Sequence, residues 1–386
     1  MEVGILLGNN VHKAMEPWDV INSQDDGPYA IRTCLGWVVN GPVISGKKAH
    51  VNYITLQTID DMLTSQFNHD FNERISDEKL EKSRDDHLFL HQLEKSTKMV
   101  NGHYETALPL KDENVCMPNN KALATQWANN MKQRFQKDSK YLEDYKGFMK
   151  GLLDKVYAVQ ITDEELRRDD GKVWYIPHHG VYHPQKGEIR VVFNCAAKFQ
   201  GISLNDRLLQ GPDPTNSLVG VLLRFRLEQI ALMADIEAMF YQVQVQKDHC
   251  DLLRFLWWPD GNIEGPLREY KMVVHLFGAV SSKSCANYAL HRTDDFGNDF
   301  DTETVGTVKG NFYVDDMLKS VRCEEAVRLV RQMRELTGKG GFDLTKWVSN
   351  SRAVLNAIPE SERAERVKSL DLDKDKLPVD RALGVM

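Results

Sequence analysis

Several features that mark special classes of protein are missing from this sequence. Its 386 residues contain only six cysteines, which are scattered and form no CxxC pair. Such spacing gives no sign of a disulfide framework or a zinc knuckle and is typical of reduced thiols inside a cell. With 13 prolines and a hydrophobic fraction of 42%, the composition also excludes collagen-like and disordered chains. We therefore expect a folded globular protein.

Long apolar runs and a basic excess are missing too. The apolar stretch at residues 3–7 has no basic flank and no long continuation, so neither a signal peptide nor a membrane span is predicted. The net charge of −7 argues against a protein that coats nucleic acid without specificity, because phosphate binding requires clustered lysine and arginine. A local basic cleft is still compatible with this charge. We expect an intracellular protein, cytoplasmic rather than nuclear, with no membrane partner.

The sequence does contain clear strand and helix patterns. Residues 4–10 and 35–42 resemble strands, so the first 45 residues look β-rich. Apolar side chains recur every fourth residue between 122 and 153, which predicts two amphipathic helices. Further strands are expected at 189–193, 230–236, 252–258, 269–274 and 312–313, and helices at 216–226, 282–292 and 324–336. This irregular alternation predicts an α+β fold with helices on one face of an antiparallel sheet.

Two adjacent aspartates, Asp315 and Asp316, lie between apolar residues, an arrangement that suits a β-hairpin turn. Neighbouring carboxylates repel each other unless a cation compensates, and Mg²⁺ prefers such oxygen ligands. Asp235 ends an apolar strand and could meet this pair across a sheet. Three carboxylates at one point are typical of two-metal phosphoryl transfer. The alternative is a solvated surface turn, the commoner meaning of an Asp-Asp pair taken alone.

These residues resemble motifs of reverse transcriptases, and the chain resembles the polyprotein of a BEL/Pao-type LTR retrotransposon. Residues 313–316, Tyr-Val-Asp-Asp, match the YxDD box, and Asp235 followed by Phe240 matches the first palm motif. The resemblance implies that Asp235 and Asp315 bind Mg²⁺ (or Mn²⁺) with Asp316 in support. It also implies that Phe240 crowds a ribose 2′-hydroxyl and so favours dNTPs. A core aromatic is the alternative for Phe240.

Four further positions resemble nucleotide-binding residues of that family. Arg190 would bind the triphosphate through its planar guanidinium, and His183 stands at a second phosphate-contacting position. Gly278 would let the backbone approach the nucleotide closely. Lys346 would lie near the pyrophosphate, with a solvated lysine as the alternative.

Two positions depart from the pattern that the resemblance leads us to expect. Asn194 stands where the family usually has aspartate, which affects local hydrogen bonding. Lys283 stands where proline is common, and the absence of proline should loosen the start of the helix slightly.

Other clusters favour structural roles. His178, His179 and His183 have no suitably spaced further ligand for zinc, so we interpret them as ordinary histidines. The pair Trp257-Trp258 could stack on bases, but its flanks fit a hairpin end packed on the core better.

The resemblance divides the chain into four parts. Residues 1–45 would be the C-terminal remnant of a retropepsin-like aspartic peptidase, and residues 46–139 a partly helical connector. Residues 140–349 would form the right-hand fingers and palm, and residues 350–386 the end of the palm, truncated before the thumb. No Asp-Ser/Thr-Gly triplet occurs in the chain, so peptidase activity is not expected.

The expected function is RNA-directed DNA polymerase activity within a retrotransposon polyprotein. This nucleotidyltransferase would join a dNTP to a primer 3′-hydroxyl on an RNA or DNA template. Without a thumb the isolated chain should bind primer and template poorly and be weak or inactive. The alternative is a truncated or co-opted protein that binds nucleic acid or a protein partner without catalysis. The sequence does not predict an oligomeric state.

Overall fold

The computed structural model describes residues 16–22, 29–34, 36–40, 82–168, 170–183, 187–368, 370 and 372. The chain divides into a first unit, residues 1–73, and a second unit, residues 74–386. This division lies inside the segment predicted as a connector, and the predicted domain boundaries stay predictions. The strand expected at residues 4–10 lies outside the described residues. None of the described helices has the length and apolar character needed to span a bilayer.

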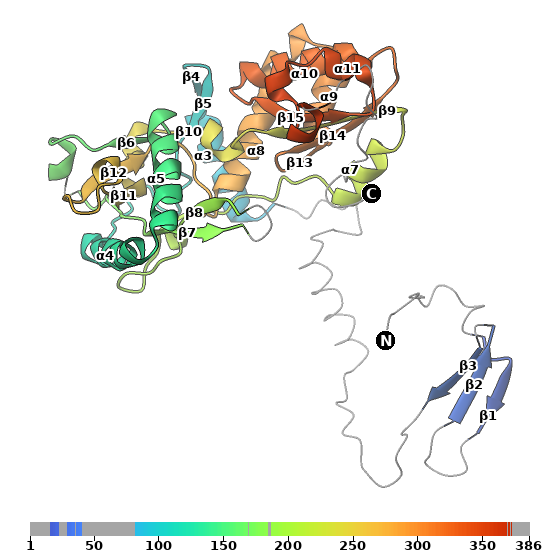
Figure 1. Ribbon diagram of the computed structural model, residues 1–386, viewed down its shortest axis with the longest axis horizontal. Helices are drawn as coiled ribbons and strands as arrows, with labels where there is room; N and C mark the ends of the chain where they lie inside the picture. The colour runs from blue at the N-terminus through green and yellow to red at the C-terminus, as the bar shows by residue number, and fades with distance from the viewer. Residues whose placement is uncertain are drawn as a thin grey trace. The chain divides into compact units, whose positions relative to one another are not determined.

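The described part of the first unit is a small antiparallel sheet (Figure 1, blue). Its strands, in the order β1-β2-β3, are β1 (Asp19–Ile21), β2 (Tyr29–Thr33) and β3 (Gly36–Asn40). Strand β3 lies within the strand expected at residues 35–42. The β-rich character expected of this region is therefore present in the residues that the structure describes.

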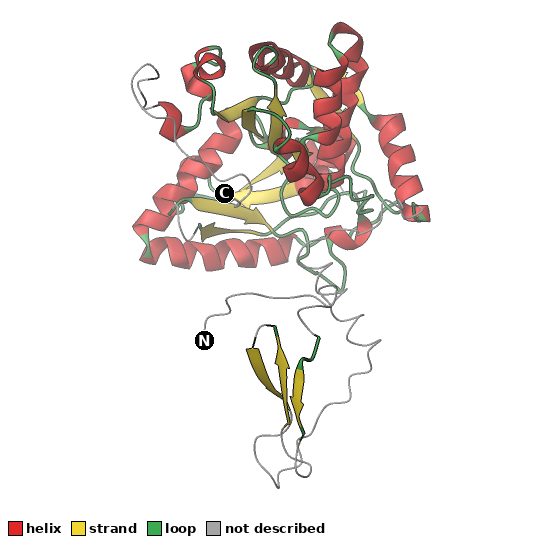
Figure 2. Ribbon diagram, turned by 90° about the vertical axis from the view of Figure 1, so that its right-hand side faces the viewer, coloured by secondary structure: helices red, strands yellow, loops and turns green. Residues whose placement is uncertain are grey.

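The second unit mixes helices and strands throughout (Figure 2), as the α+β prediction requires. Its largest sheet has the order β13-β14-β9-β15 and is antiparallel. The strands are β9 (Ile230–Ile236), β13 (Phe312–Tyr313), β14 (Asp316–Val321) and β15 (Leu344–Ser349). Three helices supply apolar side chains to the core on one face: α8 (Ser282–Arg292), α9 (Thr302–Gly310) and α10 (Ala326–Lys339).

The side chains of β9 point alternately into the core beneath the helices and toward the opposite face of the sheet. Leu232, Ala234 and Ile236 are buried in the core beneath the helices. Met233 faces the other way, into a cluster with α7 (Leu218–Phe225). Because side chains alternate along a strand, Asp235 projects from the same face as Met233, away from the α8–α10 layer.

The remaining elements surround a second, larger core. Helices α4 (Lys121–Lys137) and α5 (Ser139–Asp154) confirm the two predicted amphipathic helices. They pack against the sheet β11-β12-β6 and the hairpin β7-β8. These strands are β6 (Ala158–Gln160), β7 (His178–Tyr182), β8 (Ile189–Phe193), β11 (Arg254–Trp257) and β12 (Arg268–Met272). Trp257 and Trp258 are buried in this core, which confirms their structural interpretation.

A third sheet joins the N-terminal part of the unit to its middle. It has the order β10-β5-β4, with β4 (Lys98–Val100), β5 (His103–Thr106) and β10 (Gln244–Val245). The remaining α-helices of the described residues are α3 (Arg84–Ser96), α6 (Leu204–Arg207), α11 (Arg352–Asn356) and α12 (Glu365–Lys368). Strand β9 is therefore held within one compact body, with its C-terminal end as the start of the candidate site.

Candidate active site

Of the three acidic residues predicted to converge, Asp235 and Asp316 lie on neighbouring strands and Asp315 lies in the adjoining turn. Tyr313 pairs with Asp316 across the hairpin, which leaves a two-residue turn of Val314 and Asp315. The register between β14 and β9 places Asp316 directly opposite Asp235. In addition, the backbone N–H of Ile236 donates to the carbonyl oxygen of Asp315 at 2.9 Å. The sheet thus brings together two segments that are far apart in the sequence.

The electrostatics of the three carboxyl groups reflect this crowding. Burial, followed by the charges of Asp315 and Asp235, raises the pKa of Asp316 to about 6. Burial also raises the pKa of Asp315, and the charge of Asp235 adds to that effect. Lys346 opposes both shifts because its ammonium is nearby. The cluster is therefore short of positive charge at neutral pH.

The turn that carries Asp315 is strained. Val314 has a φ of 57°, in the left-handed region that β-branched residues rarely adopt. Backbone strain of this kind costs about 1–3 kcal/mol and persists where surrounding structure enforces it. Here the two flanking strands and the packing of Val314 against the sheet core enforce it. The geometry of the turn is thus imposed by the sheet.

An aromatic cavity lies beside the carboxylates. Its volume is about 300 Å³, and its lining residues are Ala238, Met239, Phe240, Tyr241, Phe277, Val314 and Asp315. Phe240 belongs to the short helix η2 (Met239–Gln242) that follows β9, and its ring stacks on Phe277 at 5.8 Å between centroids. Phe277 is 66% exposed. Two predicted site residues, Phe240 and Asp315, therefore line the same cavity.

Sequence reasoning did not identify Phe277 as a site residue. The available signal in the sequence was that Phe277 directly precedes Gly278, which had been singled out as a nucleotide-binding candidate. What the sequence could not reveal was the ring-to-ring contact with Phe240, which depends on how two distant segments meet.

Gly278 occupies a position that no other residue fits. Its φ is 118°, and a Cβ there would collide with the carbonyl oxygen of Phe193 at the end of β8. Asn205 holds the same loop, because its Nδ2 donates to the carbonyl oxygen of Gly278 at 3.1 Å and its Oδ1 accepts from the N–H of Val280 at 3.1 Å. The close backbone approach is therefore to β8, and a role in nucleotide binding stays a prediction.

The predicted phosphate-binding residues lie on the β7–β8 hairpin. Arg190 is exposed and pairs with Val181 across the hairpin. His183 follows β7, where its N–H donates to the carbonyl oxygen of Glu188 at 2.8 Å. Neither residue lines the aromatic cavity beside Asp315. Their roles toward a nucleotide stay predictions.

The positions that depart from the family pattern have local partners. The Oδ1 of Asn194 accepts a hydrogen bond from the N–H of Ala196 at 3.2 Å. Lys283 forms an ion pair with Asp213 at 3.2 Å, and α8 begins at Ser282, as predicted. His178 is buried and bonds to Tyr145 and to the carbonyl oxygen of Leu256, as a core histidine does.

The donor chemistry suits a divalent cation, but the side-chain arrangement does not yet form a metal site. Carboxylate oxygens are the hard ligands that Mg²⁺ and Mn²⁺ prefer. Within the described part of the chain, however, no group of three or more His, Cys, Asp and Glu side chains is placed to hold a metal ion. One contributing contact is visible: the Nζ of Lys346 lies 3.0 Å from the Oδ1 of Asp235. The Oδ1 of Asp235 is thus paired with an ammonium in this structure.

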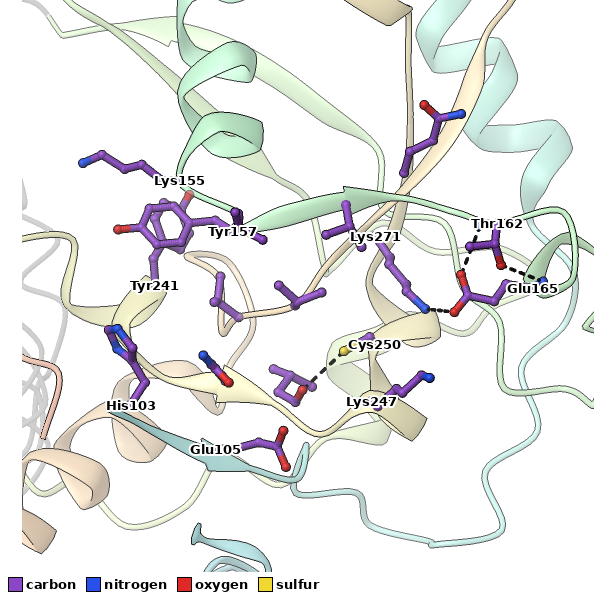
Figure 3. A pocket seen from close by; sticks show the side chains of 17 residues that line it. His103, Glu105, Lys155, Tyr157, Thr162, Glu165, Tyr241, Lys247, Cys250 and Lys271 are labelled. Atoms are coloured by element: carbon purple, nitrogen blue, oxygen red, sulfur yellow. Dashed lines mark hydrogen bonds and ion pairs between the residues drawn. The ribbon is translucent and has the colours of Figure 1, made fainter. Parts of the chain in front are cut away.

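A larger cavity of about 580 Å³ lies where β6 and β12 meet β5 and β10 (Figure 3). The rings of Tyr157 and Tyr241 meet there at 5.0 Å between centroids. The cations Lys155 and Lys271 are engaged with Glu237 and Glu165, each at 2.7 Å. Tyr241 also lines the aromatic cavity, so the two cavities share a wall beside Phe240.

Comparison with known proteins gives little beyond this geometry. No protein-family model matches the chain, and no curated protein matches it. A similar solved structure is that of a foamy viral protease-reverse transcriptase in complex with double-stranded DNA. The two share 15% sequence identity with a TM-score of 0.38, over 50% of this chain. The match spans 28% of the length of that viral chain.

Proposed function

We propose that the second unit contains the fingers and palm of a reverse transcriptase, an RNA-directed DNA polymerase. The observation that carries this proposal is the pairing of Asp316 with Asp235 on neighbouring strands, with Asp315 in the adjoining turn. Nucleotidyl transfer requires a cluster of carboxylates beside a space for a nucleotide. The aromatic cavity lined by Asp315 supplies such a space.

In the proposed reaction the carboxylates and the aromatic rings have different tasks. Asp235 and Asp315 would hold Mg²⁺ or Mn²⁺, with Asp316 in support, and the bound ions would activate the primer 3′-hydroxyl and neutralise the leaving pyrophosphate. The stacked rings of Phe240 and Phe277 would form an apolar wall for the sugar and base of a dNTP. The Phe240 ring would exclude a ribose 2′-hydroxyl by crowding it.

The phosphates would be bound by cations from different elements. Arg190 presents an exposed guanidinium, which can bind two phosphate oxygens at once. His183, on the same hairpin, would add a second donor. Lys346 lies beside Asp235 and would meet the pyrophosphate end. Together with a primer on an RNA or DNA template, these contacts describe the substrate complex.

We further propose that the chain derives from a BEL/Pao-type retrotransposon polyprotein. In this interpretation residues 1–45 are a remnant of the aspartic peptidase without its catalytic triplet. The small antiparallel sheet of the first unit is consistent with that origin.

A second candidate function is nucleic-acid or partner binding without catalysis. The observation that favours it is the side-chain arrangement at the carboxylates, where Lys346 is paired with Asp235 and no described group of side chains already forms a metal site. A co-opted protein would keep the fold and the aromatic cavity but would no longer need bound metal ions.

Primer extension on an RNA template with Mg²⁺ separates the two candidates. Catalysis predicts incorporation that Asp315→Asn abolishes, because a carboxylate ligand is lost. Asp343→Asn is the matched control, since Asp343 is an exposed carboxylate just before β15 and is assigned no task. If the natural protein and Asp315→Asn both fail to extend a primer but retard a labelled RNA·DNA hybrid equally in a gel, the binding function is correct.

A further inference from the structure

Lys346 reaches Asp235 only because β15 carries an irregularity. Thr345 pairs with Asp235 and Val348 pairs with Met233, so two residues, Lys346 and Trp347, stand opposite the single residue between them on β9. This is a β-bulge, which adds one residue to a strand and redirects side chains. Its first residue, Lys346, has a φ of 52°.

The bulge decides which side chain enters the core. In a regular ladder Lys346 would stand opposite Ala234, which is buried beneath the helix layer. The extra residue gives that position to Trp347, which is fully buried in the same core. Lys346 is thereby turned to the open face, where its Nζ lies 3.0 Å from the Oδ1 of Asp235.

Burial of Trp347 stabilises the bulge, but the pairing of Lys346 with Asp235 adds little to that stability. The side chain of Lys346 is 66% exposed and that of Asp235 23% exposed, and ion pairs in such surroundings contribute little. A left-handed backbone at a residue other than glycine costs more than such a pair returns. The ion pair therefore does not account for the bulge, and its effect is to place a positive charge beside Asp235.

We propose that Lys346 is a built-in counter-cation that occupies Asp235 when no divalent ion is bound and competes with that ion for the carboxylate. This inference rests on the proposed function, in which Asp235 is a metal ligand. An ammonium and a divalent cation that both contact the carboxylate of Asp235 repel each other. Binding of the ion therefore favours departure of Lys346, and the empty site keeps part of its charge neutralised.

Binding of Mn²⁺ alone, without nucleotide or primer, tests this competition in the full chain. The amount of free Mn²⁺ is followed by electron paramagnetic resonance for the natural protein and for Lys346→Met, which removes the charge and keeps the side-chain length. We expect Lys346→Met to bind Mn²⁺ roughly three- to tenfold more tightly at low salt, because a like charge is removed from the site. The difference should shrink as salt is added.

The matched control is Lys368→Met, which removes the same charge from a lysine paired with Glu365. It should leave Mn²⁺ affinity unchanged. Equal or weaker binding by Lys346→Met would overturn the inference, and Lys346→Gln gives the same test if the methionine variant does not fold. Asp235→Asn separates this failure from that of the proposed function. If Asp235→Asn leaves Mn²⁺ affinity unchanged, the metal site itself is wrong; if it abolishes binding while Lys346→Met has no effect, only the competition is wrong.

Discussion

At the scale of single residues, Asp316 shows how a cluster of carboxyl groups costs stability. The pKa of Asp316 is raised from 3.8 to about 6 in the folded protein, so the folded state holds its proton more tightly than the unfolded state does. Without metal, the ionised carboxylate therefore destabilises the fold at neutral pH, and that cost disappears as the pH falls from about 6 toward 4.

Asp316→Asn should consequently stabilise the metal-free protein at neutral pH. After a discount for the partial exposure of the side chain, we expect a gain of about 1 kcal/mol in the free energy of unfolding, since asparagine cannot ionise. Urea unfolding in EDTA measures this gain, with Asp343→Asn as the control that should change little. The same substitution should reduce primer extension. A loss of stability in Asp316→Asn would show that the carboxylate is not under the repulsion described.

The residue scale also marks what sequence reasoning can reach. Asp235, Asp315 and Asp316 could be identified because short motifs carry them. The structure places Asp235 and Asp316 on adjoining strands and Asp315 in the turn next to them. The contact between Lys346 and Asp235 could not be anticipated, because a β-bulge depends on how two strands align and leaves no local pattern. The stacking of Phe277 on Phe240 was missed for a similar reason.

At the scale of elements, the loop before α8 depends on one glycine. Gly278→Ala would place a methyl group against the carbonyl oxygen of Phe193 and would force alanine into a φ of 118°. We expect a loss of at least about 2 kcal/mol in the free energy of unfolding, because both backbone strain and overpacking oppose the change.

The matched control for this prediction is Gly306→Ala in α9. A Cβ at Gly306 would meet nothing within 4 Å, and alanine favours helix over glycine. That variant should gain up to about 1 kcal/mol. Thermal unfolding of both variants makes the comparison, and equal effects in the two would contradict the close packing of the loop on β8.

Regular elements with strong apolar patterns were predicted well. Strands β8 and β9 and helix α8 have the predicted bounds, since each combines a clear period with a distinct end. Helix α9 was not predicted, because its sequence TETVGTVKG contains two glycines and five β-branched residues, which are weak helix formers. Strand β15 was also missed, since its bulge interrupts the alternation on which strand prediction depends.

At the scale of the whole molecule, two buried histidines should make the second unit sensitive to acid. Burial lowers the pKa of His178 to about 4 and that of His275 to about 3. The unfolded chain takes up protons near its ordinary histidine pKa of about 6.5, whereas the folded chain does not. Stability is therefore complete above about pH 6.5 and falls as the pH decreases toward 4.

Each histidine should account for about 2–3 kcal/mol of lost unfolding free energy between about pH 7 and pH 4.5. Urea unfolding at the two pH values measures the loss. His275→Gln should reduce the difference between them, whereas His87→Gln should not, because His87 is exposed. If His275→Gln and the natural protein lose the same stability on acidification, His275 is already protonated in the folded state or is accessible to water.

The α+β fold class could be predicted from composition and periodicity, whereas the pairing of strands distant in sequence could not. The α+β character could be predicted because strand and helix patterns alternate along the chain. The pairing of β5 with β10 could not, since it joins short strands that are far apart in the sequence and whose local patterns are weak. The packing of residues 84–137 within the second unit depends on such distant contacts.

The register between β14 and β9 determines whether a misfolded chain can be told from a correctly folded one. A shift of one residue between these strands would exchange their two faces, turning Asp235 toward the hydrophobic core and Ala234 toward water. A sheet with this register shifted by one residue would no longer place Asp235 opposite Asp316. A misaligned molecule would expose apolar side chains and separate its acidic side chains. Under the proposed function, the specific activity of a preparation would therefore report the fraction of chains whose strands are correctly aligned.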